Sequence, residues 1–182
     1  MFKGCPISTD SSLVYANQER FLAVLSDGAR LCGEWLIQVH GTRYDLPHEP
    51  FVVFDLMRGG DRAPLAVLTE RVKDYGFVQP RLLHTGGPFS IEAALDALAT
   101  SGHGALDPVE GAVWRVERNE KIQQCKDSER ACQVDFLVKY VRPGKQDVSI
   151  RSDISGFKEP RWNSFVNGPA LTLKTSMGYH FQ

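Results

Sequence analysis

The stretch PVEGAVWRVER, residues 108–118, combines the pattern of a β-strand with a polar group at the start of that strand. Trp114 and Val116 fall on one face and alternate with charged residues, as expected of a strand that is buried on one side. Glu110 and Gly111 come directly before it, and a glycine lets backbone or a ligand approach closely. Such a pair is either an ordinary solvated turn or a placed functional group, and the rest of the chain must decide between them.

Composition limits the classes of protein to which the chain can belong. With 182 residues, of which 42% are hydrophobic, it is long enough for one domain with a real core and a short appendage. A formal net charge of -1 predicts no global positive field, so any nucleic-acid binding would have to use a local groove. No apolar run resembles a signal peptide or a membrane span of ~20 residues. The four cysteines lack metal-site spacing, which is typical of reduced thiols in a cytoplasmic protein.

Short apolar strands and two amphipathic helices make up most of the expected secondary structure. The helices are expected at 65–75, ended by Gly76, and at 90–101, with Ser90 as the N-cap. We predict an α+β fold, mainly of antiparallel sheets with flanking helices, with a main domain at 1–150. Residues 117–133 are expected to form a hairpin loop or a mobile segment, and 151–182 a C-terminal tail that is a partial element or a disordered end. The expected strands are 30–38, 51–57, 112–116 and 134–142.

Four motifs occur in an order that resembles the ATP-dependent RNA ligases of the covalent nucleotidyltransferase superfamily. That family carries a Gly-Glu strand, an aromatic-Asp strand, a Glu-Gly strand and a lysine-bearing strand in its adenylylation domain, which is an ATP-grasp-like nucleotidyltransferase fold. The corresponding stretches here lie between Leu31 and Arg142, and each of them alone is a weak signal. They are Gly33–Leu36, Phe51–Leu56, Glu110–Val113 and Phe136–Val141.

The resemblance implies a role for one residue of each motif. Glu34 would contact the ribose or help to order a metal, and Phe54 would stack on the base of the nucleotide. Glu110 would serve a Mg²⁺ site, and Lys139 would contact the α-phosphate; these two are the expected catalytic residues. Without the ordered set of motifs, Phe54 would be a core residue, Glu34 a turn charge and Lys139 a lysine whose head reaches solvent from an edge strand.

The family's chemistry implies the cofactors and partners. A lysine attacks the α-phosphate of ATP and holds AMP, which then passes to a 5′-phosphate end before a 3′-hydroxyl displaces it. The resemblance therefore implies a cytoplasmic RNA-repair ligase that uses ATP and Mg²⁺ on RNA or DNA ends, without a membrane. A non-catalytic nucleotide- or RNA-binding module and a capping-type guanylyltransferase remain as alternatives.

The sequence departs from the family's pattern in two places. The family's nucleophile lies in a Lys-x-Asp-Gly motif upstream of the Gly-Glu strand, and this motif does not occur here. Lys3 is the only lysine before Glu34, and it lacks the Asp-Gly context. The lysine strand also has a valine, Val141, where many family members have a second lysine. We therefore expect a domain that is incomplete at its N-terminus and does not adenylylate itself efficiently.

Overall fold

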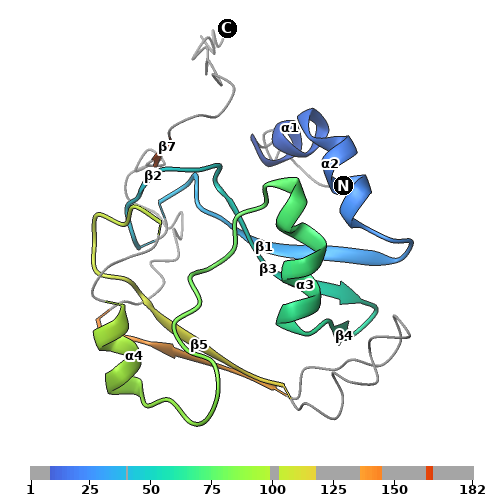
Figure 1. The fold of residues 1–182 in the computed structure, drawn as a ribbon. Helices are drawn as coiled ribbons and strands as arrows, with labels where there is room; N and C mark the ends of the chain where they lie inside the picture. Colours follow the sequence, from blue (N-terminus) through green and yellow to red (C-terminus); the bar gives the residue numbers. More distant parts are fainter. Residues whose placement is uncertain (1–8, 40, 99–102, 118–135, 145–162, 166–182) are drawn as a thin grey trace, which may run out of the picture.

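Two antiparallel sheets and a set of short helices form the core of the structure (Figure 1). The computed structural model describes residues 9–39, 41–98, 103–117, 136–144 and 163–165. The expected α+β class with mainly antiparallel strands is confirmed. Among the described residues, no helix is both long and apolar enough to cross a bilayer.

The first sheet is built around β3 (Phe51–Arg58), as expected of this apolar run. On one side β3 pairs antiparallel with β1 (Ala29–Trp35), and on the other with the two residues of β4 (Asp61–Arg62). The register between β1 and β3 shifts at Phe54, because Cys32 faces Asp55 whereas the next residue of β1 faces Val53. Phe54 is thus an extra residue in a β-bulge, which changes the face to which the following side chains point.

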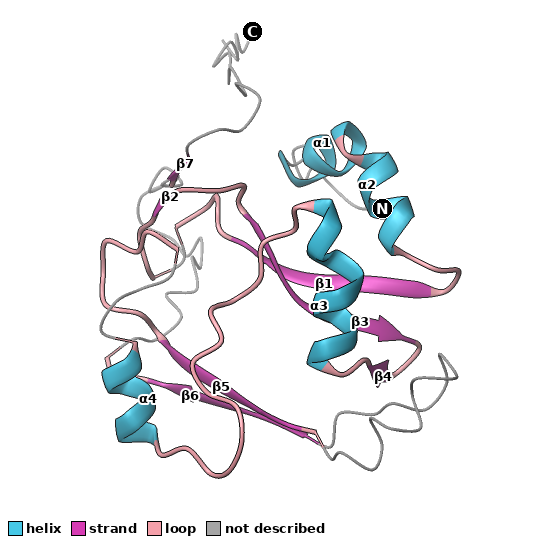
Figure 2. Ribbon diagram, viewed as in Figure 1, coloured by secondary structure: helices cyan, strands magenta, loops and turns pink. Residues whose placement is uncertain are grey.

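Helices cover one face of this sheet (Figure 2). Helix α3 (Leu65–Val72) continues into the 3₁₀ turn η1 (Lys73–Tyr75) and ends at Gly76, whose φ of 66° is left-handed, so the predicted helix is confirmed. The bulge explains why Val53 and Leu56, three residues apart, both pack against α3. The buried cluster consists of Val24, Val53, Leu56, Leu68, Val72 and Phe77.

Two short helices near the N-terminus are not predicted by the sequence. They are α1 (Thr9–Ala16) and α2 (Gln18–Val24), which meet at Asn17. Both are only two turns long, and large side chains such as Tyr15 and Leu22 remain exposed. Each helix is too short for a clear helical period. Helix α2 is fixed to the core by the fully buried Val24 and by Phe21, whose ring contacts Phe51 and Phe77.

The second sheet is a two-stranded pair of β5 (Gly111–Val116) and β6 (Phe136–Val141). Both strands are confirmed, although β6 is shorter than predicted, and residues 118–135, which contain most of the expected loop, lie outside the described part. Helix α4 (Ile91–Ala97) packs beside β5, and the Nε1 of Trp114 donates to the carbonyl of Phe89 just before it, at 2.8 Å. Ser90 is the predicted N-cap, since its Oγ accepts from the amide of Ala93.

The second predicted helix is shorter than expected. Helix α4 ends at Ala97 with Leu98 as its C-cap, and residues 99–102 lie outside the described part. Three described residues of the expected tail lie against the main body, where β7 (Ser164–Phe165) pairs in parallel with β2 (Asp45–Leu46). The division of the chain at residue 150 itself stays a prediction.

A glycine follows Glu110 because the backbone of β6 leaves no room for a side chain at this position. A Cβ atom at this position would lie 1.8 Å from the carbonyl oxygen of Tyr140 and 3.1 Å from the Cα of Val141. Strand β6 therefore approaches β5 more closely here than any other residue type allows. The glycine sets the distance between the start of β5 and the end of β6.

We expect Gly111→Ala to lower the free energy of unfolding by at least about 2 kcal/mol, because the new methyl group meets backbone rather than a movable side chain. Urea titration followed by circular dichroism measures this change. Gly60→Ala is the matched control, since a Cβ there meets nothing within 4 Å and the residue has no left-handed φ. Equal midpoints for the two variants would contradict the close approach of β6.

Candidate functional site

Glu110 and Lys139 meet at one end of the β5–β6 pair. Lys139 lies opposite Val113 in the ladder, and the amide of Arg142 donates to the carbonyl of Glu110 at 2.8 Å, which extends the ladder to that residue. The Nζ of Lys139 lies 2.8 Å from Oε1 of Glu110. The side chains are 57% and 34% exposed, so the pair contributes little to stability and remains accessible to a ligand.

Tyr44 joins this pair to Glu34. The pKa of the Tyr44 phenol is raised by burial and, to a smaller extent, by the nearby charges of Glu110 and Glu34; a hydrogen bond with Thr42 opposes the shift. Both carboxylates thus lie within electrostatic range of one phenol, although they come from different sheets. Because the raised pKa favours the protonated form, Tyr44 keeps a neutral hydroxyl within electrostatic range of the two carboxylates.

The loop that carries Tyr44 is fastened to the segment that leads into Glu110. The amide of Asp45 donates to the carbonyl of Gly104, and the amide of Leu106 donates to the carbonyl of Arg43, at 2.8 and 2.9 Å. The Arg43 guanidinium also binds both oxygens of Asp107, at 2.7 and 2.9 Å. These contacts hold residues 42–46 against residues 103–107, three residues before Glu110.

His48 and His103 form a further contact between the same two segments. The Nε2 of His48 lies 2.7 Å from Nδ1 of His103, and the two rings are almost perpendicular. The Nδ1 of His48 lies 2.6 Å from the carbonyl of Glu49, so this nitrogen carries a proton in the assigned tautomer. Burial lowers the pKa of His103, and the charge of His48 lowers it further. The lowered pKa keeps the His103 imidazole neutral at neutral pH, and its contact with His48 fastens the loop.

Phe54 lies on the face of the first sheet that turns away from the helices. It occupies the bulge of β3, is 39% exposed and does not belong to the buried cluster. Val113 on β5 is 60% exposed and shares a face of the β5–β6 pair with Lys139 and Arg115. Since Arg115 reaches the carbonyl of Phe54 at 3.4 Å, this face of β5 is turned toward the bulge. Phe54 and Val113 thus offer apolar surface beside the polar groups.

Arg115 connects the two sheets below these side chains. Its Nη1 binds Oδ1 of Asp55 at 2.5 Å, and its Nη2 donates to the carbonyl of Ala63. Asp55 is only 2% exposed, and its other oxygen accepts from Nε of Arg62 at 2.6 Å. A carboxylate buried to this extent needs such partners, because it has lost nearly all of its water.

The same guanidinium reaches the start of helix α3 through Glu117. The Nε of Arg115 lies 2.5 Å from Oε1 of Glu117, and this oxygen also accepts from the amide of Leu65 at 2.8 Å. Leu65 is the first residue of α3, where amides lack partners within the helix and a carboxylate is favourable. One arginine therefore fixes β5 relative to β3, β4 and α3.

The carboxylates suit a hard cation only together with other ligands. Within the described ranges, no group of three or more His, Cys, Asp or Glu side chains is arranged to hold a metal ion. Mg²⁺ is commonly held by one or two carboxylates, with phosphate oxygens and water completing its shell. Glu110 and Glu34 fit that requirement by their chemistry, whereas the donors present do not form a cage for a structural metal.

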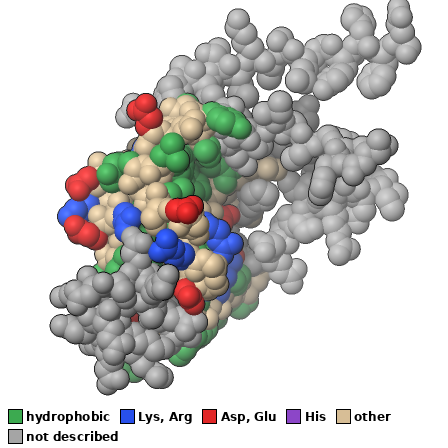
Figure 3. All heavy atoms as spheres, turned by 90° about the vertical axis from the view of Figure 1, so that its right-hand side faces the viewer, with side chains coloured by type: hydrophobic (Ala, Val, Ile, Leu, Met, Phe, Trp, Pro, Cys, Tyr) green, Lys and Arg blue, Asp and Glu red, His purple; other side chains and the backbone are tan. Residues whose placement is uncertain are grey.

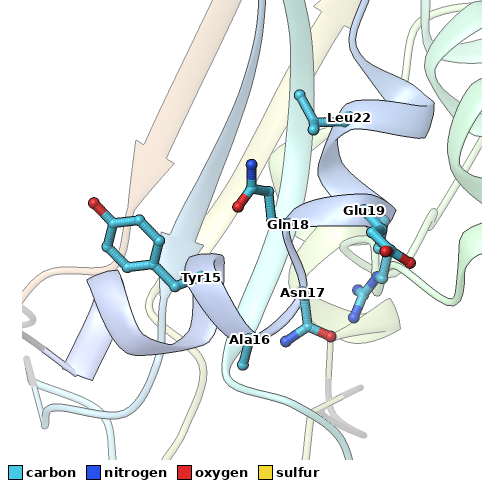
Figure 4. A pocket seen from close by; sticks show the side chains of 7 residues that line it. Tyr15, Ala16, Asn17, Gln18, Glu19 and Leu22 are labelled. Carbon is cyan, nitrogen blue, oxygen red and sulfur yellow. The ribbon is translucent and has the colours of Figure 1, made fainter.

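Two other surface features are poorer candidates. The hollow at the junction of α1 and α2 is lined by consecutive residues of one segment, with Tyr15 and Leu22 pointing outward at its rim (Figure 4). It brings together no polar groups from distant parts of the chain. The face shown in Figure 3 carries Lys and Arg side chains interspersed with Asp and Glu. Neither feature has the convergence that the Glu110 region shows.

The structure thus brings together three of the four predicted site residues around Tyr44: Glu34, Glu110 and Lys139. No described contact joins the Phe54 side chain to these three residues, and its carbonyl accepts from Arg115 on β5. Their individual roles stay predictions. Tyr44, Arg115 and Val113 are additional residues that the sequence pattern does not single out. The signals available in the sequence were an aromatic residue inside a loop bounded by turn residues, and one arginine on an alternating strand.

A comparison with known protein families finds a match that covers the segment of the site. A family model described as RNA ligase matches residues 2–141, which includes every residue of the site named above. Neither the curated proteins nor the solved structures contain a significant match.

We expect Arg115→Met to lower the free energy of unfolding by about 3 kcal/mol, because it leaves Asp55 buried with one partner instead of two. Denaturant titration at neutral pH measures the loss. Arg30→Met is the control, since the Arg30 guanidinium lies at the surface and donates to the carbonyl of Gly59. If the two substitutions cost the same, Arg115 does not have the connecting role that its contacts indicate.

Proposed function

The chain belongs to the RNA ligase family, and from this premise we propose that the Glu110 region binds ATP with Mg²⁺ for the joining of RNA ends. The family supports a ligase-type function in general. The finer proposal is an ATP-grasp-like nucleotidyltransferase that transfers AMP to a 5′-phosphate end, which a 3′-hydroxyl then displaces. We further propose that this chain alone performs the covalent step poorly.

The observation that carries the proposal is the contact between Glu110 and Lys139 beside Tyr44 and Glu34. These residues lie on four separate segments, yet one phenol is affected by both carboxylates and one carboxylate binds the lysine. Surface charges brought together in this way, next to exposed Phe54 and Val113, provide the polar groups and apolar wall that a nucleotide pocket requires.

Each group has a task that follows from its chemistry. The ammonium of Lys139 offsets negative charge at a phosphate, and it would exchange Glu110 for that phosphate when the ligand enters. Glu110 is then available for a cation, and Mg²⁺ would neutralise phosphate charge when bound. Phe54 would stack on the base, and Val113 would supply further apolar surface, since both side chains are exposed.

The covalent step requires a nucleophilic lysine. The sequence contains no Lys-x-Asp-Gly motif, and Lys139 is paired with Glu110. One ammonium group cannot both stabilise the phosphate and attack it, because attack requires the neutral amine. Lys3, the only lysine before Glu34, lies outside the described residues. These points favour nucleotide binding over efficient self-adenylylation, and a non-catalytic binding module remains the second candidate.

We expect the wild-type chain to bind ATP in the presence of Mg²⁺, and Lys139→Ala to weaken this binding by roughly tenfold through loss of a charge-assisted contact. Isothermal titration calorimetry measures both affinities. Lys73→Ala is a matched control, because Lys73 forms an exposed ion pair with Glu70 at 2.6 Å on α3, away from the site. Equal losses in the two variants, or no ATP binding by the wild type, would refute the proposed site.

Incubation with α-labelled ATP tests the covalent step separately. We expect at most a trace of acid-labile adduct from residues 1–182 alone, because the sequence has no Lys-x-Asp-Gly motif and Lys139 is paired with Glu110. A stoichiometric adduct would show that the chain is a competent nucleotidyltransferase, and peptide mapping would then identify its nucleophile. ATP binding without an adduct would support the binding module.

A further inference from the structure

Asn163 holds the loop between the two motif strands of the first sheet. Its side chain accepts from the amide of Tyr44 at 2.8 Å and donates from Nδ2 to the carbonyl of Leu36 at 2.7 Å. Its own amide donates to the carbonyl of Ile37 at 2.7 Å. These three hydrogen bonds connect residues more than a hundred positions apart, and Asn163 is only 6% exposed.

The residues that follow Asn163 strengthen the same contact. The Oγ of Ser164 donates to Oδ1 of Asp45 at 2.7 Å, and β7 pairs in parallel with β2. Leu46, in β2, is fully buried. Residues 163–165, here named the C-terminal clasp, therefore determine the path of the loop on both sides of Tyr44.

The backbone of Tyr44 is held by residues from distant parts of the chain. The loop leaves β1 directly after Glu34 and Trp35, and Asn163 binds it at both the start of this excursion and at Tyr44. On the other side, Tyr44 forms a single β-bridge with Ala105. The backbone of Tyr44 is thus held from two sides, by Asn163 and by the segment that leads into Glu110.

We propose that Asn163 is a positioning residue that acts through Tyr44, whose hydroxyl contacts the bound nucleotide. The identity of the ligand rests on the function proposed above, whereas the positioning of Tyr44 does not. The clasp lies beyond residue 141, where the family match ends, so it adds a segment to the site that the family assignment does not include.

An asparagine suits this task because a carboxamide donates and accepts at the same time. Its oxygen binds the Tyr44 amide and its nitrogen binds the Leu36 carbonyl, so both backbone groups are satisfied by one side chain. Alanine supplies neither group and would leave a buried amide and a buried carbonyl without these partners, which is costly. The geometry therefore predicts a specific effect of Asn163→Ala on Tyr44.

Amide hydrogen exchange tests the positioning directly. We expect the Tyr44 amide to exchange at least roughly tenfold faster in Asn163→Ala, while the Val53 amide, which donates from β3 to the carbonyl of Val78, keeps its protection. Asn17→Ala is the matched control, because Asn17 also donates from Nδ2 to a backbone carbonyl, that of Leu13 at the α1–α2 junction. Unchanged exchange at Tyr44 would overturn the proposal.

A double-mutant cycle on ATP affinity tests whether Asn163 acts through Tyr44. Tyr44→Phe and Asn163→Ala should each weaken ATP binding by roughly fivefold, and the double variant should be no weaker than the worse single one. A merely structural asparagine would give additive losses, which would overturn the proposal, as would an unchanged affinity of Tyr44→Phe.

Two further outcomes of these experiments also decide for or against the proposal. If Asn163→Ala does not fold, Ser164→Ala, which removes only the contact with Asp45, should show a smaller increase of exchange at Tyr44, and no increase would overturn the proposal. If the wild type binds no ATP, the nucleotide contact of Tyr44 fails together with the proposed function. The exchange data would still decide whether Asn163 positions Tyr44.

Discussion

The contact between Arg115 and the buried carboxylate of Asp55 is the constraint on which the arrangement of the two sheets depends. Removing a carboxylate from water costs several kcal/mol, so Asp55 is stable only where two guanidinium groups meet it. One of them comes from the neighbouring turn and the other from β5. Because Arg115 also binds Glu117 and the Ala63 carbonyl, β5 has one orientation that satisfies every group. The orientation of β5 also determines the directions in which its other side chains point.

This constraint has a direct consequence for the electrostatics of the site. Val113 and Arg115 point to the same side of β5, so fixing Arg115 on β3 also turns Lys139, the partner of Val113, toward the first sheet. Glu110 follows because the ladder continues to it, and Gly111 brings β6 close enough for the ion pair. Two carboxylates and one ammonium group then share a small region with a neutral phenol. Such a region has a net negative charge, which a cation or a lysine released from its pair can offset.

Much of this arrangement could be predicted from sequence, and the remainder could not, for identifiable reasons. Strands β3, β5 and β6 follow from apolar runs and alternation, and the end of α3 follows from Gly76. The bulge at Phe54 leaves no mark in the local pattern, because it depends on the register with β1. Strict alternation places Leu56 on the face opposite to Val53, whereas the structure buries both against α3. The order of four weak motifs indicated the site, since the fold must bring such segments together for any of them to function.

The role of Tyr44 was beyond sequence analysis for a different reason. A tyrosine in a loop has no periodic pattern, and its placement depends on residues 103–107 and on Asn163, which are distant along the chain. Loops that carry functional groups need such outside support, because their own backbone hydrogen bonds are unsatisfied within the loop. Here the support comes from three directions, namely the strand that carries Glu34, the segment that leads to Glu110, and the C-terminal clasp. A substitution in any of these segments therefore changes the position of the Tyr44 phenol, and with it the electrostatic environment of both carboxylates. The loop, rather than either sheet, is the part of the site most sensitive to distant substitutions.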